Sequence, residues 1–364
     1  MWPYWLMYLT FASFAVAGKE HRQSRGTGLR STRFTAASIF IWFLLVIMIG
    51  LRFEVGGDWG NYIRNFSRLG GLSLEEVFQR TNAEPGYTLL SYFSHALGTD
   101  IYGVNVVCAA IFATGLLGFC RTLPYPELAV AAATPYLIIV VAMGYTRQAT
   151  ALGFEMLGLV ALSRKSVVLF VVWALLAATF HKTAVVLIPL VALVNARNRV
   201  WAVLWGGVGL AAGYYALLDS DADKLVRNYV GTAMSSSGGI IRVLMNAVPA
   251  LLLLVWRRRF TYNPGDEQLW FWMAIISLAL LVAVVATPSS TAVDRIALYF
   301  LPIQIFVFSN LPVVLRKQFG GARSVILGVL CYYALVQFVW LNYADNVWGW
   351  VPYGSALLPE PSRR

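Results

Sequence analysis

The chain has 364 residues, of which 59% are hydrophobic and only 12% are charged. A soluble core cannot bury that much apolar surface, so the composition excludes an ordinary soluble domain and favours an all-α polytopic membrane protein. The formal net charge is +11. In a membrane protein such an excess of Lys and Arg is typical of cytoplasmic loops, and it does not indicate a nucleic-acid partner.

The apolar segments predict about twelve transmembrane helices within a single membrane domain, residues 1–364. In chain order they cover residues 2–17, 34–51, 101–120, 128–143, 149–163, 166–180, 184–194, 200–218, 240–256, 269–287, 296–313 and 324–341. Several of these segments are shorter than the ~20 residues that a straight span needs. We therefore expect the helices between 128 and 194 to be tilted, broken or partly submerged.

The basic loops give an orientation. Placing loop 18–33 in the cytoplasm and alternating the spans puts the later basic loops on that same side. This alternation requires that residues 86–98 do not cross the membrane, so we predict a re-entrant or interfacial helix there. The opposite side then exposes two loops, 52–100 with short helices and 219–238. In a bacterial inner membrane that side is the periplasm.

Polar groups are costly in a membrane protein and are often functional. Arg147 opens a helix in the run GYTRQ, and its planar guanidinium suits a phosphate group. His181 and Lys182 interrupt an apolar stretch near the outer end of a span, where His can act as a base and Lys can pair with phosphate. The alternatives are an interfacial arginine that reaches water and a hydrogen-bonded packing histidine.

Carboxylates supply further candidates. Asp58 follows two glycines and Glu84 precedes Pro85-Gly86, so a tight backbone positions each of them. The alternative for either is a solvated charge or a helix cap. In the adjacent pair Asp294-Arg295, one residue is a ligand candidate and the other an anchor of the bundle, or both form structural ion pairs. The sequence contains no HExxH, P-loop or GxGxxG motif, and we expect neither a metal nor a cofactor.

Six runs, taken in this order, resemble the EpsG family, a branch of the Wzy-type polysaccharide polymerases. They read RFEVGGDWGNY, EPGYTLL, GYTRQATALGF, ATFHKTAVVLIP, DRIALYF and WVPYGSA, and they span roughly residues 52–353. The resemblance implies a GT-C-like architecture and a metal-independent glycosyltransferase of the bacterial inner membrane, with its active site facing the periplasm.

The resemblance also implies the substrate. Such enzymes use oligosaccharide repeat units linked to undecaprenyl diphosphate. The growing glycan leaves its lipid diphosphate and is transferred to a hydroxyl at the non-reducing end of another lipid-linked unit. A flippase and a chain-length regulator are the implied protein partners.

The reaction assigns the candidate residues to three roles. A metal-free transfer must neutralise the diphosphate with protein cations, for which Arg147, Arg295, Lys182 and Arg52 are candidates. The acceptor hydroxyl needs a base, and Glu84, His181 and Asp58 are candidates. The candidates for glycan contact are Trp59, Tyr62, Tyr145, Asp294 and Tyr353, and the alternative for these aromatic residues is the membrane-interface belt.

Three other functions compete with this one. A lipid-linked glycan flippase needs charges on both sides of the bilayer, whereas the candidates here gather on one side. A GT-C glycosyltransferase that uses a polyprenyl monophosphate sugar usually has an acidic pair in its first outer loop, which Asp58 with Glu54 matches poorly. The third competing function is an acyltransferase, with which the motif around His181 is also compatible.

Overall fold

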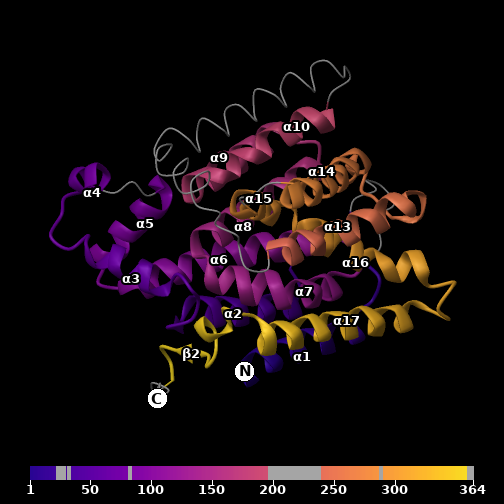
Figure 1. The fold of residues 1–364 in the computed structure, drawn as a ribbon, viewed down its shortest axis with the longest axis horizontal. Coiled ribbons are helices and arrows are strands. Elements are labelled where there is room, and N and C mark those ends of the chain that lie inside the picture. The colour runs from indigo at the N-terminus through magenta and orange to yellow at the C-terminus, as the bar shows by residue number, and fades with distance from the viewer. Residues whose placement is uncertain (22–29, 31–33, 81–83, 196–238, 287–289, 359–364) are drawn as a thin grey trace.

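The computed structural model describes residues 1–21, 30, 34–80, 84–195, 239–286 and 290–358. In these residues the protein is almost entirely helical, and its short strands β1 and β2 pair antiparallel, with Arg52 opposite Ser355. Figure 1 shows the helices packed together in one bundle, with α3, α4 and α5 extending from one end of it.

The elements follow in chain order. The first are α1 (Trp2–Ala17), α2 (Ala36–Gly50), β1 (Arg52–Phe53), α3 (Trp59–Ser67), α4 (Leu74–Arg80), α5 (Pro85–Ala96) and α6 (Asp100–Cys120). The middle ones are α7 (Pro126–Ala133), the π-helix η1 (Thr134–Ala142), α8 (Thr146–Ser163), α9 (Val167–Phe180), the 3-10 helix η2 (Lys182–Leu187) and α10 (Ile188–Asn195). The last are α13 (Gly239–Val255), η3 (Arg257–Arg259), α14 (Asp266–Ala286), α15 (Ser290–Ala297), η4 (Leu298–Phe300), α16 (Pro302–Leu315), α17 (Ala322–Tyr343), η5 (Val347–Gly349) and β2 (Gly354–Ser355).

The predicted apolar segments that lie in the described residues coincide with helices or with runs of consecutive helices. Segment 200–218 and loop 219–238 lie outside the described residues. By length and composition, 4 helical segments in the described residues can cross a membrane: Asp100–Cys120, Asp266–Ala286, Val293–Leu315 and Ala322–Tyr343. Shorter apolar helices accompany them. The helical content and these apolar helices confirm the prediction of a helical membrane protein. The number of spans stays a prediction.

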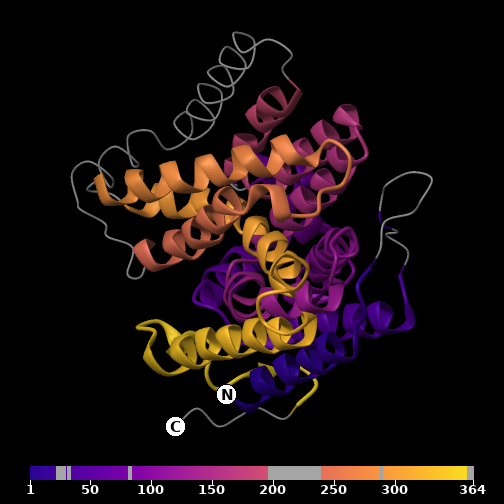
Figure 2. The same ribbon diagram turned by 90° about the vertical axis from the view of Figure 1, so that its right-hand side faces the viewer.

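One apolar core runs through the bundle. Helix α6 packs between α2 and α8, α8 packs against α9, and α16 packs against both α13 and α17. Helix α1 lies along α17 in both views (Figures 1 and 2). Helices such as α2, with the sequence AASIFIWFLLVIMIG, are apolar on every side. This pattern is typical of helices that contact protein on one side and lipid on the other.

Basic loops that are far apart in sequence meet at one end of the bundle, which we call the basic end. Arg30, between α1 and α2, donates hydrogen bonds to the carbonyl of Thr122 at 3.3 Å and to Asn263 Oδ1 at 3.4 Å. Arg316, after α16, lies 3.6 Å from a carboxylate oxygen of Glu20. The loops that charge alternation places on one side are therefore neighbours in the fold.

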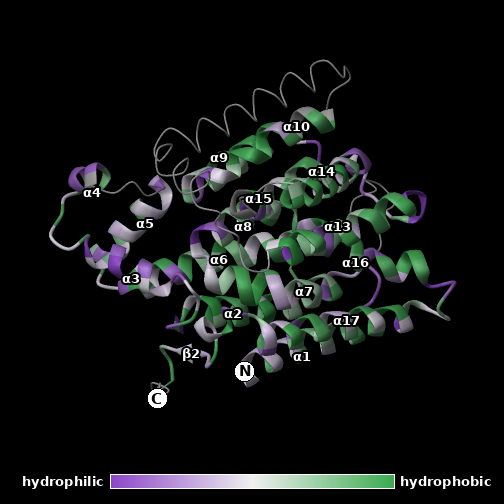
Figure 3. Ribbon diagram, viewed as in Figure 1, coloured by the Kyte–Doolittle hydropathy of each residue, from purple (hydrophilic) through white to green (hydrophobic). Residues whose placement is uncertain are grey.

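Helices α3, α4 and α5 extend from the opposite end, and they are the more hydrophilic part of the molecule (Figure 3). Both ends of α5 remain beside α3, because the rings of Tyr62 and Tyr87 are 5.8 Å apart and those of Phe66 and His95 are 5.6 Å apart. Helix α5 therefore runs along α3 and not through the length of the bundle.

Two glycines join three distant segments at this end. Gly56 has φ +104°, and a Cβ there would lie 2.5 Å from the carbonyl oxygen of Met143. Its N–H donates to the carbonyl of Gly349 at 2.7 Å. A Cβ on Gly144 would overlap the ring of Trp350, which is buried and donates from Nε1 to the carbonyl of Ile139 at 2.8 Å. Only glycine lets the turn after β1 pack this closely on the α8 entry and the C-terminal segment.

We expect Gly144→Ala to lower the free energy of unfolding by about 1–3 kcal/mol, because the added methyl forces the Trp350 ring out of a packed site. Thermal unfolding of the detergent-solubilised protein, followed by tryptophan fluorescence, measures this change. Gly328→Ala in α17 is the matched control, since a Cβ there meets nothing within 4 Å. Equal midpoints for the two variants would contradict the packing role of Gly144.

Candidate functional site

The run Glu84-Pro85-Gly86 places a carboxylate against the end of another helix. Glu84 is extended, with φ −62° and ψ 133°, as expected for a residue before proline, and Pro85 takes the first position of α5. A Cβ on Gly86 would lie 2.5 Å from Thr179 Oγ1 in α9. The absence of a side chain at Gly86 therefore lets the first turn of α5 approach the C-terminus of α9.

This approach brings together Glu84, Arg147 and His181, which we call the Glu84 cluster. Arg147 Nη1 donates to Glu84 Oε2 at 2.6 Å, and His181 Nδ1 lies 3.1 Å from Glu84 Oε1. Each carboxylate oxygen thus has its own nitrogen partner. The Glu84 side chain is 8% exposed, whereas that of Arg147 is 34% exposed, so the arginine is the member open to a ligand.

Burial of the Glu84 carboxyl by itself raises its pKa. The hydrogen bond from His181 and the positive charge of Arg147 act in the opposite direction and prevail, so the pKa falls from 4.5 to about 2. Glu84 is therefore ionised at neutral pH, and in this arrangement it is a weak base. The carboxylate fixes its two neighbours more effectively than it can accept a proton.

Aromatic rings hold the guanidinium of Arg147. Its Cζ lies 5.9 Å from the ring centroids of both Tyr62 and Tyr87. A small cleft between α3 and α5 opens beside it. Tyr87 OH and Thr88 Oγ1 are buried and have no hydrogen-bond partner within the described residues. The surroundings of Arg147 thus combine a cation, ring faces and unsatisfied hydroxyls, which are the groups that bind phosphates and sugars.

A second ion pair lies nearby on α13 and α15. Arg242 donates from Nε and Nη2 to the two oxygens of Asp294, at 2.7 and 2.5 Å. Gln148, next to Arg147, donates from Nε2 to the carbonyl of Arg295 at 3.1 Å. The side chain of Arg295 itself is exposed. The start of α8 therefore connects the Glu84 cluster to the Asp294 pair.

The remaining cation candidates differ in accessibility. Arg52 is 1% exposed and donates to the carbonyls of Ile49 and Val55 and to Thr146 Oγ1, so its guanidinium holds the turn after α2 together. Lys182 is half-buried at the start of η2, directly after His181.

The remaining carboxylate and aromatic candidates lie around the cluster. Asp58 is half-buried at the N-cap of α3, where its Oδ1 accepts from Asn61 at 3.4 Å. Trp59 packs on Phe53, Tyr145 packs on Trp350, and Tyr353 donates from its OH to the carbonyl of Met48. Tyr62 is the aromatic candidate that contacts Arg147.

Sequence reasoning missed two polar residues in apolar runs. Arg242 lies in IIRVLMNAV, and Glu155 lies in the middle of α8, where it is 1% exposed and both its oxygens have no partner among the described residues. An ionisable residue inside an apolar segment was the available signal for both. In the part of the chain that the structure describes, no three His, Cys, Asp or Glu side chains gather as metal ligands.

The fold and the charged clusters define a polytopic helical membrane protein with a polar site at one end of its bundle. The EpsG family model matches residues 35–355, and the chain belongs to the EpsG family. This match confirms the resemblance inferred from the six sequence runs, and it indicates a polysaccharide polymerase-like membrane protein. Searches of curated proteins and of solved structures found no match.

We expect Glu84→Gln to lower the free energy of unfolding by about 2–3 kcal/mol at pH 7, because Arg147 loses a buried charged partner. Since folding depresses the pKa of Glu84, this stabilisation is complete above about pH 4.5 and is lost as the pH falls toward about 2. The difference in melting temperature between wild type and variant should therefore be constant from pH 8 to 5 and narrow below 4.5. Glu75→Gln, at an exposed position in α4, is the control. If the difference in melting temperature between wild type and Glu84→Gln stays constant down to pH 3, Glu84 is not the ionised partner of Arg147 and His181.

Proposed function

We propose that the protein is a polysaccharide polymerase that transfers a glycan from undecaprenyl diphosphate to a hydroxyl at the non-reducing end of another lipid-linked repeat unit. The observation that carries this proposal is the Glu84 cluster, in which Arg147 is held by a buried carboxylate, contacts two tyrosine rings and remains one-third exposed. Membership of the EpsG family supports the same reaction class.

Arg147 is the principal diphosphate ligand in this proposal. Its guanidinium offers five N–H donors in a planar fork, and the contact with Glu84 Oε2 engages one end of that fork. Arg295 and Lys182 add positive charge from α15 and η2. Fixed cations of this kind stabilise the negative charge that develops on the departing diphosphate, which is often the largest catalytic contribution.

His181 is the proposed base, with Glu84 orienting it. The Glu84 carboxylate faces Nδ1, which leaves Nε2 as the proton acceptor, and Nε2 has no hydrogen-bond partner within the described residues. The acceptor hydroxyl oxygen attacks the anomeric carbon of the donor glycan and its proton passes to Nε2. The bond from that carbon to the diphosphate breaks, and its electrons leave with the diphosphate. Asp58 is the alternative base.

The orientation follows from charge. The basic end faces the cytoplasm and the Glu84 cluster faces the periplasm, in a bacterial inner membrane with about twelve spans and a GT-C-like arrangement. The course of α5 beside α3 supports an interfacial helix at 86–98. A flippase that delivers the repeat units and a chain-length regulator are the expected protein partners.

Arg147→Gln should reduce polymer formation at least 100-fold while single lipid-linked repeat units accumulate, because one oxyanion-type donor is commonly worth that much. Gel analysis of glycans from cells with equal protein levels measures this effect. Arg68→Gln, in an exposed position after α3, should leave the ladder unchanged. A normal ladder from Arg147→Gln would overturn the assignment.

His181→Gln keeps a hydrogen-bonding side chain opposite Glu84 but removes the proton acceptor. We expect a fall of about 100-fold or more in the rate of polymerisation with purified protein and lipid-linked units, in the range typical of general-base loss. The affinity for the lipid-linked unit should change little. A weaker affinity with an unchanged maximal rate would instead assign His181 to substrate binding.

A lipid-linked glycan transporter is the second candidate, since Glu155 is a buried and unpartnered acid inside the bundle. Purified protein given lipid-linked repeat units, with and without EDTA, separates the candidates. A polymer ladder that EDTA does not affect supports the proposed polymerase. Accelerated exchange of the lipid between leaflets without a ladder supports a transporter. A parallel incubation supplies a polyprenyl monophosphate sugar in place of the repeat units. A product formed only in that incubation supports a GT-C glycosyltransferase that uses a monophosphate donor.

A further inference from the structure

The cleft beside Arg147 is enclosed by two helix faces. Its lining residues recur at the spacing of a helix face, so they fall on one side of α3 and on the side of α5 that meets it. From α3 and the turn that follows come Tyr62, Asn65, Phe66 and Leu69, and from α5 come Tyr87, Thr88 and Ser91. Arg147 completes the lining from the start of α8, so the cleft adjoins the proposed phosphate ligand.

The size of the cleft limits its occupant. The free space is about 40 Å³, and about 10–15 Å³ is needed to hold one water molecule. A group of a few non-hydrogen atoms therefore fits, whereas a whole sugar ring does not. The cleft is thus the size of a substituent on a sugar whose ring stays outside.

One buried hydroxyl in the cleft is not used by the protein. Thr88 is 3% exposed, and within the described residues its Oγ1 has no hydrogen-bond partner. Ser91, one turn further along α5, shows the usual arrangement, because its hydroxyl donates to the carbonyl of Tyr87 at 2.8 Å. A buried polar group without a partner is destabilising, so a ligand atom that accepts from Thr88 would restore a lost hydrogen bond.

The other lining residues differ in polarity. Phe66 and Leu69 contribute apolar surface, and Asn65 is exposed and offers its amide at the opening. A matching group therefore needs an apolar end, a hydrogen-bond acceptor and a donor within a few atoms. An acetamido group has all three, in its methyl, its carbonyl oxygen and its N–H. A hydroxyl lacks the apolar end, and a carboxylate would place a charge against Phe66 and Leu69.

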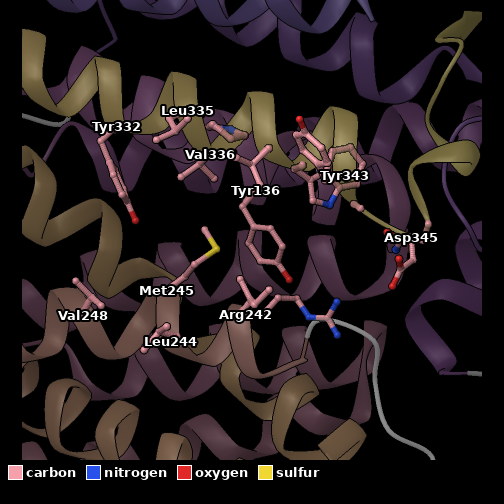
Figure 4. A pocket seen from close by; sticks show the side chains of 16 residues that line it. Tyr136, Arg242, Leu244, Met245, Val248, Tyr332, Leu335, Val336, Tyr343 and Asp345 are labelled. Atoms are coloured by element: carbon pink, nitrogen blue, oxygen red, sulfur yellow. The ribbon is translucent and has the colours of Figure 1, made fainter.

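A wider groove of about 580 Å³ lies between α13 and α17, and Figure 4 shows the side chains that line it. Most of these side chains are apolar, and the arginine among them, Arg242, already donates to both oxygens of Asp294. Thr88, by contrast, has a hydroxyl to offer. A small polar ligand therefore gains more from the cleft than from the groove.

The position of Arg147 indicates which sugar carries the acetamido group. Arg147 is 34% exposed and is the proposed diphosphate ligand, so the sugar nearest to the cleft is the one bonded to the diphosphate. The substituent closest to that bond is on the ring carbon next to the anomeric carbon. An acetamido group on this carbon can enter the cleft while the phosphate stays at the guanidinium.

We propose that the cleft selects a donor whose first sugar is an N-acetylated amino sugar, and that Thr88 is a specificity-determining residue. The acetamido carbonyl accepts from Thr88 Oγ1, the methyl packs on Phe66 and Leu69, and the N–H donates to Asn65 Oδ1. The proposal rests on the proposed function, because it names the sugar that the diphosphate carries. It adds selection to the site, since Arg147 binds a phosphate whatever sugar is attached.

Two soluble probes that differ in this one group test the cleft: N-acetylglucosamine 1-phosphate and glucose 1-phosphate. Each is titrated against the full-length protein in detergent and followed by saturation-transfer NMR. We expect the acetylated probe to bind about 10-fold more tightly, a ratio that one hydrogen bond to a buried polar group commonly supplies. Its acetyl methyl protons should receive the strongest saturation, because they contact Phe66 and Leu69.

Thr88→Val removes the hydroxyl and keeps the shape of the side chain. It should abolish the preference for the acetylated probe without lowering the melting temperature, because the replaced hydroxyl has no partner within the described residues. A threonine with a purely structural role would instead lower the melting temperature and leave the preference intact.

Two further variants accompany it. Ser91→Ala, in the same wall, is the matched control and should keep the preference, because the hydroxyl of Ser91 is already bonded within the helix. Asn65→Ala, at an exposed position, changes the opening without touching the core and should weaken the preference.

Equal binding of the two probes by the wild type would overturn the proposal, and so would an unchanged preference in a folded Thr88→Val. The binding assay does not need polymerisation, so the two proposals fail separately. A polymer ladder from a wild type that binds both probes equally refutes the cleft assignment and retains the polymerase. A preference that depends on Thr88, without a ladder, refutes the polymerase and retains the cleft as part of a sugar-phosphate site.

Discussion

The contact on which the site depends is the buried carboxylate of Glu84 between Arg147 and His181. A charge removed from water is costly unless it is paired and hydrogen-bonded, and here each oxygen has a separate partner. The same contact joins α5, α8 and α9. The geometry of the site therefore depends on how these three helices pack. The depressed pKa of Glu84 expresses this: the carboxylate is far more stable as a partner of the two nitrogens than as a protonated acid.

The backbone around this cluster is fixed by close packing rather than by further charges. Gly56 and Gly144 remove side chains where the turn after β1, the entry to α8 and Trp350 meet. Arg52 satisfies main-chain carbonyls in the same turn. A rigid support of this kind keeps Arg147 in place while its outer face stays open, as the proposed stabilisation of a departing diphosphate would require.

A second ion pair, between Arg242 and Asp294, is connected to the cluster of Glu84, Arg147 and His181. The connection runs through Gln148, which directly follows Arg147 and donates to the carbonyl of Arg295, the neighbour of Asp294.

The sequence by itself determined the helices and the family. Apolar runs must form helices in a bilayer because no water satisfies their backbone groups, and this rule located the elements without knowledge of their packing. It also brought Glu84, Arg147 and His181 forward as candidates. Only the tertiary structure decided that these three form one cluster, that Arg52 is buried among carbonyls, and that the overlooked Arg242 partners Asp294. The contacts join residues far apart in the chain, and which face of a helix meets which neighbour depends on packing that no local pattern encodes.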